Sequence, residues 1–225
     1  MLVDERSFER ARLRMVEEQI RARGIRDDRV IAAMRGVPRH RFVDPVFFDQ
    51  AYEDHPLPIG ESQTISQPYM VALMAASLSL VGHETVLDIG TGSGYQAAVF
   101  ARLCRWVYSI ERCESLARKA QHRLSAMGYK NITVVVGDGT LGWEAHAPYE
   151  AIGVAAAAPN IPAPLAEQLV PGGRLCIPLG SRHSQVLVVG VKHGAALEIQ
   201  DVCGCEFVPL IGARGWGARY EELSD

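Results

Sequence analysis

The feature that most constrains the fold is a glycine-rich turn between a short apolar run and a helix-forming segment. Residues 85–89 are too short a run for a helix, which indicates a buried strand. Gly90, Gly92 and Gly94 follow at alternate positions, and residues 96–101 are good helix formers. Glycine lets the backbone turn tightly and lets a ligand lie against bare main chain, while the first free N–H groups of the helix face that ligand. The stretch therefore predicts the front of a βαβ unit.

The spacing of these glycines and the acid before them restrict the kind of ligand. A dinucleotide fingerprint has the pattern Gly-x-Gly-x-x-Gly and seats a pyrophosphate on the helix N-terminus. Here the third glycine comes one residue early, and Asp88 precedes the first. An anion would be repelled by the Asp88 carboxylate, whereas an ammonium or a sulfonium would be attracted. An ordinary tight turn is the alternative, and the acid with its flanking pattern favours the ligand site.

Composition and charge limit the broad class of protein. The chain has 225 residues, of which 48% are hydrophobic and 22% charged, so it can bury a core within one domain. The net charge of −3 argues against a general nucleic-acid binder, which would carry a basic face. Residues 1–42 are nevertheless rich in arginine. A solvated helix face is the preferred interpretation of these arginines, and a surface for an acidic partner is the alternative.

The cysteines and the apolar runs indicate the compartment. No metal site is expected, because the cysteines lack zinc-ligand spacing; they are Cys104, Cys113, Cys176, Cys203 and Cys205. The first residues contain no long apolar region, so no signal peptide is expected. No uncharged apolar run reaches the roughly 20 residues of a membrane span. These features predict a cytoplasmic protein that does not associate with membranes.

The N-terminal part, residues 1–50, is predicted to form a helical cap outside the sheet. Residues 5–23 indicate a charged helix ended by Gly24, with an apolar face that comprises Leu13, Val16 and Ile20. A second helix, capped by Asp27 or Asp28, carries Val30, Ile31 and Met34 and stops at Gly36 and Pro38.

Residues 51–69 are predicted to be a substrate or active-site loop. Prolines and a glycine make residues 52–68 irregular backbone, and their length exceeds that of ordinary structureless connections. Pro68 suits the first turn of a following helix that extends to Leu78. Ser66 lies just before that helix, so it is either a functional residue or simply the N-cap.

Later strands place further polar groups near the glycine turn. Residues 107–110 form a second strand that ends at Glu111, where an acid can accept hydrogen bonds from the ribose hydroxyls of an adenosine cofactor. Residues 132–136 form a third strand followed by Asp138, whose carboxylate could receive an adenine amino group, although Asp-Gly is also a common turn. The small residues 156–158 after a fourth strand, 151–155, leave room for substrate or allow close backbone packing.

The order of these segments predicts an α/β fold. Strands and helices alternate over residues 70–180, which indicates a doubly wound, parallel sheet, with a turn at 171–173 leading into a strand at 174–178. Residues 181–225 are β-rich, and the strands at 185–191 and 197–202 should be antiparallel because a short turn joins them. Residues 207–210 are extended by Pro209. One domain of 225 residues is expected.

With these residues in hand, the chain resembles the protein-L-isoaspartate O-methyltransferases, AdoMet-dependent enzymes that methylate the free carboxylate of isoaspartyl residues in damaged proteins. The word Thr64-Ile65-Ser66-x-Pro68 is the most specific, since other methyltransferases share the glycine loop and lack this word. Other matching words include Met15-Val16-x-x-Gln19, Arg23-Gly24-Ile25, Val37-Pro38-Arg39, Tyr52-Glu53-Asp54, Gly137-Asp138-Gly139, Ala156-Ala157-Ala158-Pro159, Gly172-Gly173-Arg174-Leu175 and Phe207-Val208-Pro209-Leu210. The resemblance covers about residues 15–216.

The resemblance implies the Rossmann-like AdoMet-dependent methyltransferase fold, S-adenosyl-L-methionine as cofactor and S-adenosyl-L-homocysteine as product. It makes Ser66 the catalytic serine. The residues expected to bind the cofactor are Gln63, Thr64, Ile65, Asp88, Gly90, Thr91, Gly92, Ser93, Gly94, Glu111, Asp138 and Gly139. Those expected to bind the substrate are Ile59, Gly60, Ser66, Ala156, Val208, Pro209 and Leu210. Ser62 and Ala155 depart from the usual family pattern.

The implied function is protein repair, with isoaspartyl proteins and peptides as substrates and a monomer as the working form. The substrate carboxylate has a pKa of about 4 and needs no general base. The alternatives are a methyltransferase for a small molecule or nucleic acid, and a non-catalytic AdoMet- or peptide-binding module. A nicotinamide dehydrogenase is disfavoured by the glycine spacing.

Overall fold

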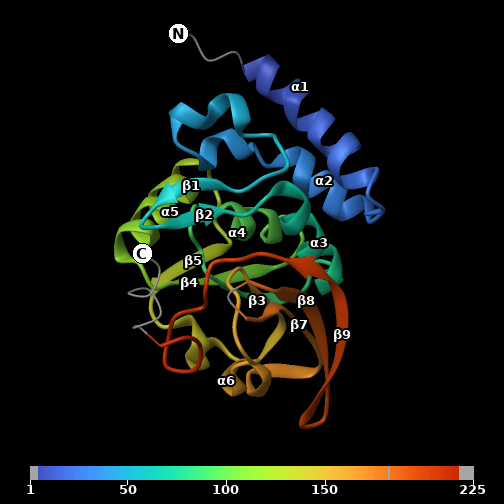
Figure 1. Cartoon of the computed structure of the whole chain (residues 1–225), viewed down its shortest axis with the longest axis vertical. Coiled ribbons are helices and arrows are strands. Elements are labelled where there is room, and N and C mark those ends of the chain that lie inside the picture. The colour runs from blue at the N-terminus through green and yellow to red at the C-terminus, as the bar shows by residue number, and fades with distance from the viewer. Residues whose placement is uncertain (1–4, 182, 218–225) are drawn as a thin grey trace.

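The computed structural model, which describes residues 5–181 and 183–217, is built around a seven-stranded sheet in the order β5-β4-β3-β6-β7-β8-β9 (Figure 1). The strands are β3 (Thr85–Ile89), β4 (Trp106–Glu111), β5 (Ile132–Val136), β6 (Tyr149–Val154), β7 (Leu169–Gly180), β8 (Gln185–His193) and β9 (Ala196–Cys205). The strands from β5 to β7 are parallel, whereas β8 and β9 are antiparallel to their neighbours. The predicted doubly wound, mostly parallel sheet with antiparallel C-terminal strands is confirmed.

The two faces of the sheet carry two separate hydrophobic clusters because side chains alternate along each strand. On β3, Val86 belongs to the cluster under one set of helices, and its neighbour Leu87 belongs to the opposite cluster. The first cluster is covered by α2 (Asp28–Gly36), α3 (Pro68–Leu78), α4 (Tyr95–Phe100) and α5 (Glu114–Ala126). The second includes Leu165 of α6 (Ala163–Glu167). The carboxyl ends of β3, β4 and β6 are therefore held between two packed layers.

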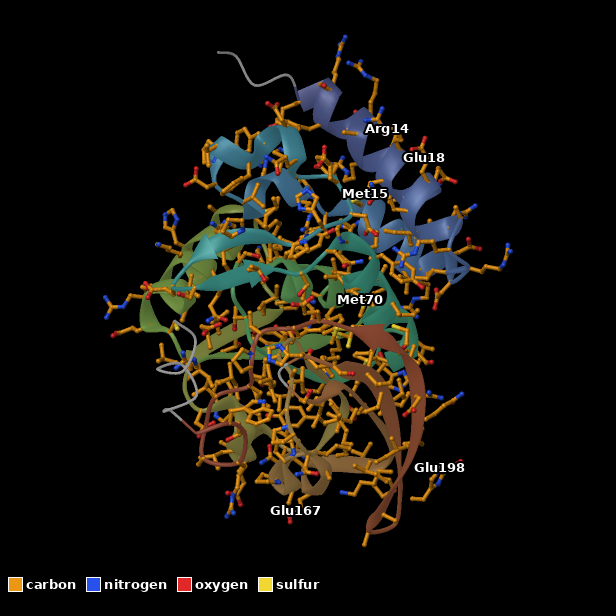
Figure 2. The ribbon with its side chains drawn as sticks, viewed as in Figure 1. Arg14, Met15, Glu18, Met70, Glu167 and Glu198 are labelled. Atoms are coloured by element: carbon orange, nitrogen blue, oxygen red, sulfur yellow. The ribbon has the colours of Figure 1, made fainter. Side chains whose placement is uncertain are left out.

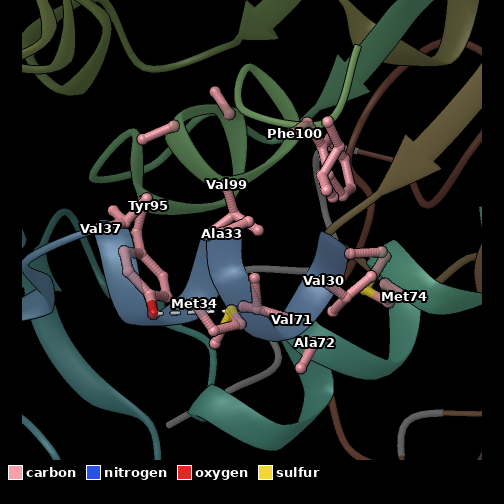
Figure 3. Packing of buried hydrophobic residues seen from close by; sticks show 14 of the residues in the cluster. Val30, Ala33, Met34, Val37, Val71, Ala72, Met74, Tyr95, Val99 and Phe100 are labelled. Atoms are coloured by element: carbon pink, nitrogen blue, oxygen red, sulfur yellow. Dashed lines mark hydrogen bonds between the residues drawn. The ribbon is translucent and has the colours of Figure 1, made fainter. Parts of the chain in front are cut away.

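The N-terminal helices pack directly on helices of the first layer. Figure 3 shows Met34 of α2 between Val71 of α3 and Tyr95 of α4, with the Tyr95 hydroxyl 3.9 Å from the Met34 sulfur. Ile20 and Met34 are fully buried in the same cluster as Val86 of the central strand. The cap and the sheet thus share one continuous core.

The first predicted helix is present, and two of its three predicted apolar residues, Val16 and Ile20, are buried as expected. α1 (Glu5–Met15) continues as a π-helical segment, η1 (Val16–Arg21), rather than as one α-helix to residue 23. Leu13, predicted on the apolar face, is 42% exposed, and Met15 is buried instead. Figure 2 shows Met15 on the inner side of this helix, with Arg14 and Glu18 on the outer side. The buried stripe is thus displaced by about one residue from the face that a 3.6-residue period through Leu13 would give.

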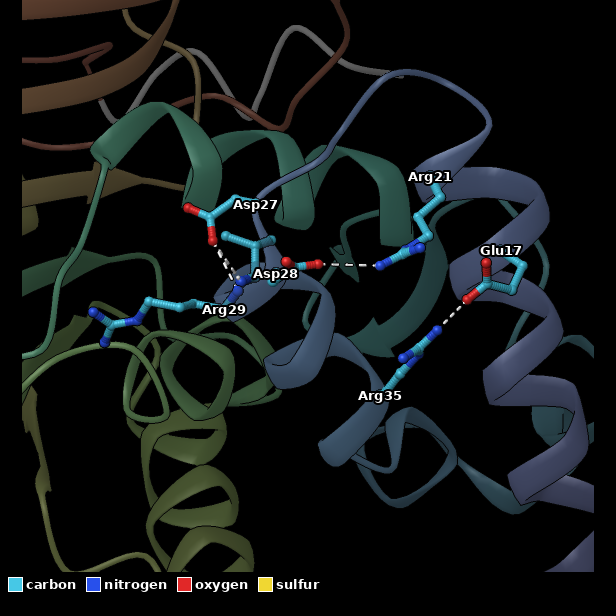
Figure 4. Close-up of polar contacts among 7 residues, drawn as sticks. Glu17, Arg21, Asp27, Asp28, Arg29 and Arg35 are labelled. Atoms are coloured by element: carbon cyan, nitrogen blue, oxygen red, sulfur yellow. Dashed lines mark hydrogen bonds and ion pairs between the residues drawn. The ribbon is translucent and has the colours of Figure 1, made fainter.

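Polar contacts fix the second helix to the first. Asp27 is the N-cap of α2, as predicted, and its carboxylate accepts hydrogen bonds from the backbone N–H groups of Arg29 and Val30. Ion pairs join Arg21 to Asp28, at 3.1 Å, and Arg35 to Glu17 (Figure 4).

After α2, the chain forms two 3-10 turns, η2 (Arg39–Phe42) and η3 (Pro45–Gln50).

The stretch predicted to be irregular contains a β-hairpin, which is a second correction. β1 (Leu57–Gly60) pairs antiparallel with β2 (Gln63–Ile65) in a separate two-stranded sheet. Glu61 and Ser62 connect them with φ of +53° each, the left-handed backbone that a tight primed turn requires. Pro58 is compatible with this arrangement because a two-stranded ribbon consists only of edge strands.

The predicted turn at 171–173 is a third correction, since these residues lie inside the continuous strand β7. Its pairing with β6 shifts register there, from Tyr149 opposite Leu169 to Ala151 opposite Arg174. The bulge accommodates the Pro-Gly-Gly sequence without ending the strand. Short 3-10 turns, η4 (Gly139–Leu141) and η5 (Glu144–His146), separate β5 from β6. No helix in the described ranges combines the length and apolarity needed to cross a membrane.

Candidate active site

A pocket of about 740 Å³, open solvent at its mouth included, lies at the carboxyl ends of the parallel strands. This is the end of an open α/β sheet at which ligands generally bind. Many of the predicted site residues form its walls, although they come from distant parts of the chain. They are Gln63, Thr64, Ile65, Ser66, Gly90, Thr91, Gly92, Ser93, Glu111, Gly139, Ala156, Val208, Pro209 and Leu210.

The glycine loop needs its glycines for two different reasons. Gly90 and Gly92 line the pocket with φ of +89° and +52°, so the main chain presents no side chain to a ligand there. Gly94, at φ +91°, does not line the pocket: a Cβ at this position would lie 3.3 Å from Leu124 of α5. Gly94 therefore allows α5 to pack against the loop rather than making room for a ligand.

Glu111, at the end of β4, is 5% exposed and lies on the pocket wall. One carboxylate oxygen accepts a hydrogen bond from the Gly92 N–H at 2.8 Å, and the other from the Cys113 N–H at 2.9 Å. Each carboxylate oxygen has a further lone pair, so the group can also accept from a pair of ligand hydroxyls. The glycine loop and the predicted ribose acceptor are thus linked directly.

Asp88 is fully buried and does not line the pocket, contrary to the expectation that it faces the ligand directly. Its oxygens accept hydrogen bonds from Ser109 Oγ at 2.6 Å and Gln96 Nε2 at 2.9 Å. Ser109 Oγ lies 2.6 Å from the hydroxyl of Thr91, which is on the wall. Burial raises the pKa of Asp88 to about 6, although both hydrogen bonds act in the opposite direction. The Asp88 carboxylate therefore lies behind the residues that form the pocket wall.

Asp138 is likewise outside the pocket wall, and its neighbour Gly139 lines it instead. One carboxylate oxygen accepts from the Thr140 N–H and hydroxyl at 2.9 and 2.6 Å, and the other from the Ala213 N–H at 2.7 Å. Burial raises the pKa of Asp138, but the hydrogen bonds from Ala213 and Thr140 outweigh burial and leave it below its usual range. The carboxylate fastens the C-terminal loop to the start of η4.

Ser66 lies between β2 and α3, where the pocket meets a second cavity. It is not the N-cap of α3: that position is Gln67, with ψ of 148° and no side-chain capping bond. Within the described ranges, the Ser66 hydroxyl has no hydrogen-bond partner. The capping alternative for Ser66 is therefore wrong, and the hydroxyl is available to a bound molecule.

The second cavity is an open groove of about 1370 Å³, solvent included, which shares Thr64, Ser66, Ala155 and Val208 with the first. Its far side is held by Arg23, whose guanidinium lies 3.4 Å from the Tyr69 ring centroid and 2.6 Å from Asp54. Cys203 and Cys205 of β9 also line it. The groove leads from the protein surface to Ser66.

The predicted substrate residues lie on both sides of this junction. Val208 accepts a backbone hydrogen bond from Ala157 at 2.8 Å, and the Leu210 N–H donates to the Ala157 carbonyl at 2.7 Å, so the extended 208–210 segment lies beside the small residues after β6. Ile59 and Gly60 line neither cavity. The Ile59 methyl instead lies 3.1 Å from where a Gly92 Cβ would be, which packs the hairpin onto the glycine loop.

Gln96 and Tyr95, at the start of α4, were missed by the sequence interpretation although both line the pocket. The available signal was a polar residue in the first turn of the helix that follows the glycines. Arg112 lines the pocket next to Glu111 and was also missed. In the ranges that the structure describes, no group of three or more metal-ligating side chains could hold a metal ion.

Comparisons with known proteins agree with this geometry. The family model described as protein-L-isoaspartate(D-aspartate) O-methyltransferase matches residues 10–215. A protein-L-isoaspartate O-methyltransferase from Syntrophobacter fumaroxidans is 55% identical over 93% of this chain and 98% of its own length. One from Geobacter metallireducens is 54% identical over 95% and 99%.

Solved structures give the same result. A protein-L-isoaspartate O-methyltransferase superposes with a TM-score of 0.82 at 28% identity, over 91% of this chain and 67% of that one. The Plasmodium falciparum protein, solved in complex with S-adenosyl-L-homocysteine, gives 0.77 at 25% identity, over 88% and 97%. The family match over nearly the whole chain and the fold both lead to one conclusion: the chain belongs to the protein-L-isoaspartate O-methyltransferase family.

Proposed function

We propose that this chain transfers a methyl group from S-adenosyl-L-methionine to the free carboxylate of L-isoaspartyl residues in damaged proteins and peptides. The observation that carries the proposal is the meeting of two cavities at Ser66, one lined by the glycine loop and one lined by residues of α3 and β9. A small cofactor and a peptide can therefore reach one point from opposite sides. Relatives more than half identical to this chain carry this activity in their names.

The pocket walls fit the cofactor. Glu111 offers a buried carboxylate for the ribose hydroxyls, and the bare backbone at Gly90 and Gly92 leaves room for a close approach. The negative charge of Asp88 behind the wall favours the cationic methionine end. When bound, S-adenosyl-L-methionine supplies a methyl group on a sulfonium, which is activated for displacement. The cofactor-binding residues proposed here are the predicted wall residues, with Asp88 and Asp138 acting from behind the wall.

The chemistry of the methyl acceptor explains which side chains lie near Ser66, where the two cavities meet. An isoaspartyl carboxylate with a pKa of about 4 is already an anion at neutral pH, so no general base is required. The linings of the two cavities, over the described ranges, include no histidine or lysine. A water-poor cleft favours the transition state because the charges of carboxylate and sulfonium cancel as the methyl group moves.

Ser66 is proposed as the residue that positions the carboxylate. Its hydroxyl is free in the structure and can donate one hydrogen bond to a substrate oxygen while leaving the other oxygen to attack. A single neutral donor orients the anion without stabilising it so strongly that its attack is slowed. In-line placement of this kind can lower a barrier by roughly 7–11 kcal/mol.

Selection of isoaspartate over aspartate must depend on the main chain, because the two differ by the position of one backbone methylene. The groove is bordered by the hairpin residue Thr64 on one side and by Val208 on the other. Both belong to extended segments, which can hold a peptide backbone by β-type hydrogen bonds. We propose that these two segments position the peptide about Ser66.

A methyl-transfer assay on an isoaspartyl peptide and its aspartyl twin tests the function. Tritiated S-adenosyl-L-methionine should label the isoaspartyl peptide and leave the aspartyl peptide unlabelled. Equal labelling of the two peptides would refute the proposed selectivity. Labelling of RNA or of small carboxylic acids in preference to either peptide would replace the proposed function with the alternative methyltransferase. Tight cofactor binding without any methyl acceptor would support the non-catalytic module.

We also propose that the chain works as a monomer in the cytoplasm, without binding nucleic acid or membranes. Both cavities are lined by residues of one chain, so no second copy is needed to complete them. The five cysteines are free thiols, which suits a reducing compartment. Sedimentation equilibrium at micromolar concentration should give the monomer mass of 24.6 kDa.

A further inference from the structure

The side chain of Gln96 contains a buried acceptor that nothing in the protein satisfies. Gln96 is 6% exposed, and its Oε1 atom has no hydrogen-bond partner among the described residues. A buried carbonyl oxygen without a donor is costly, and such groups are rare in native proteins. Because Gln96 is one of the residues that line the pocket, its unpaired acceptor indicates that a ligand supplies the donor.

The orientation of the Gln96 amide follows from its other contact. Gln96 Nε2 lies 2.9 Å from the Asp88 carboxylate, and an ionised carboxylate can only accept hydrogen bonds. The amide nitrogen must therefore point to Asp88, which turns Oε1 away from it. Ser109 holds the other Asp88 oxygen at 2.6 Å, so the carboxylate itself is fixed. The glutamine thus lies between the buried charge and the pocket.

The chemistry of this position selects one part of the cofactor. A neutral oxygen backed by a carboxylate favours an N–H donor that carries positive charge. S-adenosyl-L-methionine and S-adenosyl-L-homocysteine each have one such donor, the α-ammonium group. The adenine amino group is neutral, and Gly139, next to Asp138, lies against the side chain of Ile89, which points to the opposite face of β3 from Asp88. The ammonium is therefore the better match.

We propose that Gln96 Oε1 accepts a hydrogen bond from the α-ammonium group of the bound cofactor, with Asp88 orienting the glutamine from behind. This assignment rests on the proposed use of S-adenosyl-L-methionine by the chain. It gives Asp88 an indirect role and makes Gln96 the residue that touches the ligand.

Calorimetric titration of two ligands tests the contact without relying on catalysis. The ligands are S-adenosyl-L-homocysteine and its analogue that lacks the α-amino group, and the quantity compared is the ratio of their dissociation constants. Gln96→Met, which keeps the length of the side chain but accepts no hydrogen bond of comparable strength, should lower the preference for the amino ligand by about tenfold or more. A preference that stays within about twofold of the wild type would overturn the assignment.

Ser109→Ala is the matched control, because it removes the other hydrogen bond to Asp88 and Ser109 itself does not line the pocket, although its hydroxyl also contacts that of Thr91. Its ligand preference should remain within about threefold of the wild type at a pH of about 8.5, where Asp88 is ionised. An equal loss of preference in Ser109→Ala and Gln96→Met would mean that the ammonium responds to the placement of the Asp88 carboxylate rather than to Gln96 Oε1, which would refute the contact.

A crystal structure of the unaltered protein with S-adenosyl-L-homocysteine tests the same point if Gln96→Met does not fold. The ligand nitrogen should lie within about 3.2 Å of Gln96 Oε1. A water molecule at that position, with the nitrogen bound elsewhere, would overturn the proposal. Failure of the wild-type protein to bind either ligand would instead refute the proposed cofactor, so the two proposals fail in different ways.

Discussion

At the scale of single residues, the structure separates polar groups that line the pocket from polar groups that lie behind its wall. Ser66, Glu111 and Gln96 line the pocket. Asp88 and Asp138 do not line it, and their carboxylates accept hydrogen bonds from other groups of the protein. The same residue type, aspartate, was expected on the wall in both cases. Position in the fold, rather than residue type or burial, decides which carboxylates line the pocket, since the buried Glu111 does and the half-buried Asp138 does not.

The role of Ser66 can be tested by removing its hydroxyl. Ser66→Ala should lower kcat for the isoaspartyl peptide by roughly tenfold to a hundredfold, the value of one hydrogen bond to a charged group. Affinity for S-adenosyl-L-homocysteine should change by less than about threefold, because other groups hold the cofactor. Ser125→Ala, on the exposed side of α5, serves as the control and should behave as the wild type. Unchanged kcat in Ser66→Ala would remove this residue from the mechanism.

Asp88 should make the stability of the ligand-free protein depend on pH. Its pKa is raised from 3.8 to about 6 by burial, so the native state keeps a proton that the unfolded chain has already released. The contribution of Asp88 to stability should therefore fall as the pH rises from about 4 to about 6 and then stay constant, at a total cost of roughly 3 kcal/mol.

Asp88→Asn tests that cost because the amide carries no charge at any pH. Urea unfolding should show the variant gaining stability over the wild type between pH 4 and 6, by roughly 1–3 kcal/mol at neutral pH. The variant should also bind S-adenosyl-L-homocysteine more weakly, since the charge behind the pocket is lost. A stability difference that does not vary with pH would contradict the assignment of the raised pKa to Asp88.

At the scale of elements, the hairpin β1–β2 places Ser66, the residue proposed to position the substrate carboxylate. Its tip is anchored twice: Glu61 accepts a hydrogen bond from Ser115 of α5 at 2.6 Å, and Ile59 packs on the glycine loop. Ser62 holds φ of +53° at the turn, a conformation that side chains branched at Cβ disfavour strongly. The shape of the groove therefore depends on a turn several residues away from Ser66.

Ser62→Val tests this dependence. The left-handed backbone should cost the variant about 1–2 kcal/mol of unfolding free energy and should raise KM for the isoaspartyl peptide. Ser79→Val is the matched control: Ser79 has φ of +52° at the end of α3 but lines neither cavity. It should lose similar stability with unchanged KM. An equal KM for the isoaspartyl peptide in the two variants would show that the conformation of the turn at Ser62 does not affect substrate binding.

Local patterns predicted the elements better than they predicted the contacts. The strand at 132–136 and the Asp27 cap were placed correctly because apolar runs and cap chemistry act within a few residues. The hairpin at 57–65 was missed, since its prolines are unusual in strands and its pairing depends on the turn at Glu61 and Ser62. The roles of Asp88 and Gln96 depend on distances across the fold, which no spacing in the sequence encodes.

At the scale of the whole molecule, the N-terminal helices and the sheet form one hydrophobic cluster. Val16 and Ile20 of η1 are completely buried together with Met74 of α3 and Val107 of β4. The arginine-rich helix is thus not an independent appendage, and its charged residues are exposed except for Arg12, which is partly buried against Tyr52. We propose that the described parts of residues 1–225 unfold as a single domain. The boundaries at residues 50, 69 and 180 then separate regions with different functions, not regions that fold independently.

Ile20→Ala should destabilise the entire molecule if this core is continuous. Ile20 is 0% exposed, and removal of its side chain should cost about 2–5 kcal/mol. Circular dichroism reports all helices, whereas the three tryptophans, Trp106, Trp143 and Trp216, report only the sheet half of the chain. Both signals should shift together in urea. Leu13→Ala, at a site 42% exposed, should change stability by about 0.5 kcal/mol or less. A loss of helix signal that precedes the tryptophan transition in Ile20→Ala would instead show that the N-terminal layer folds as a separate unit.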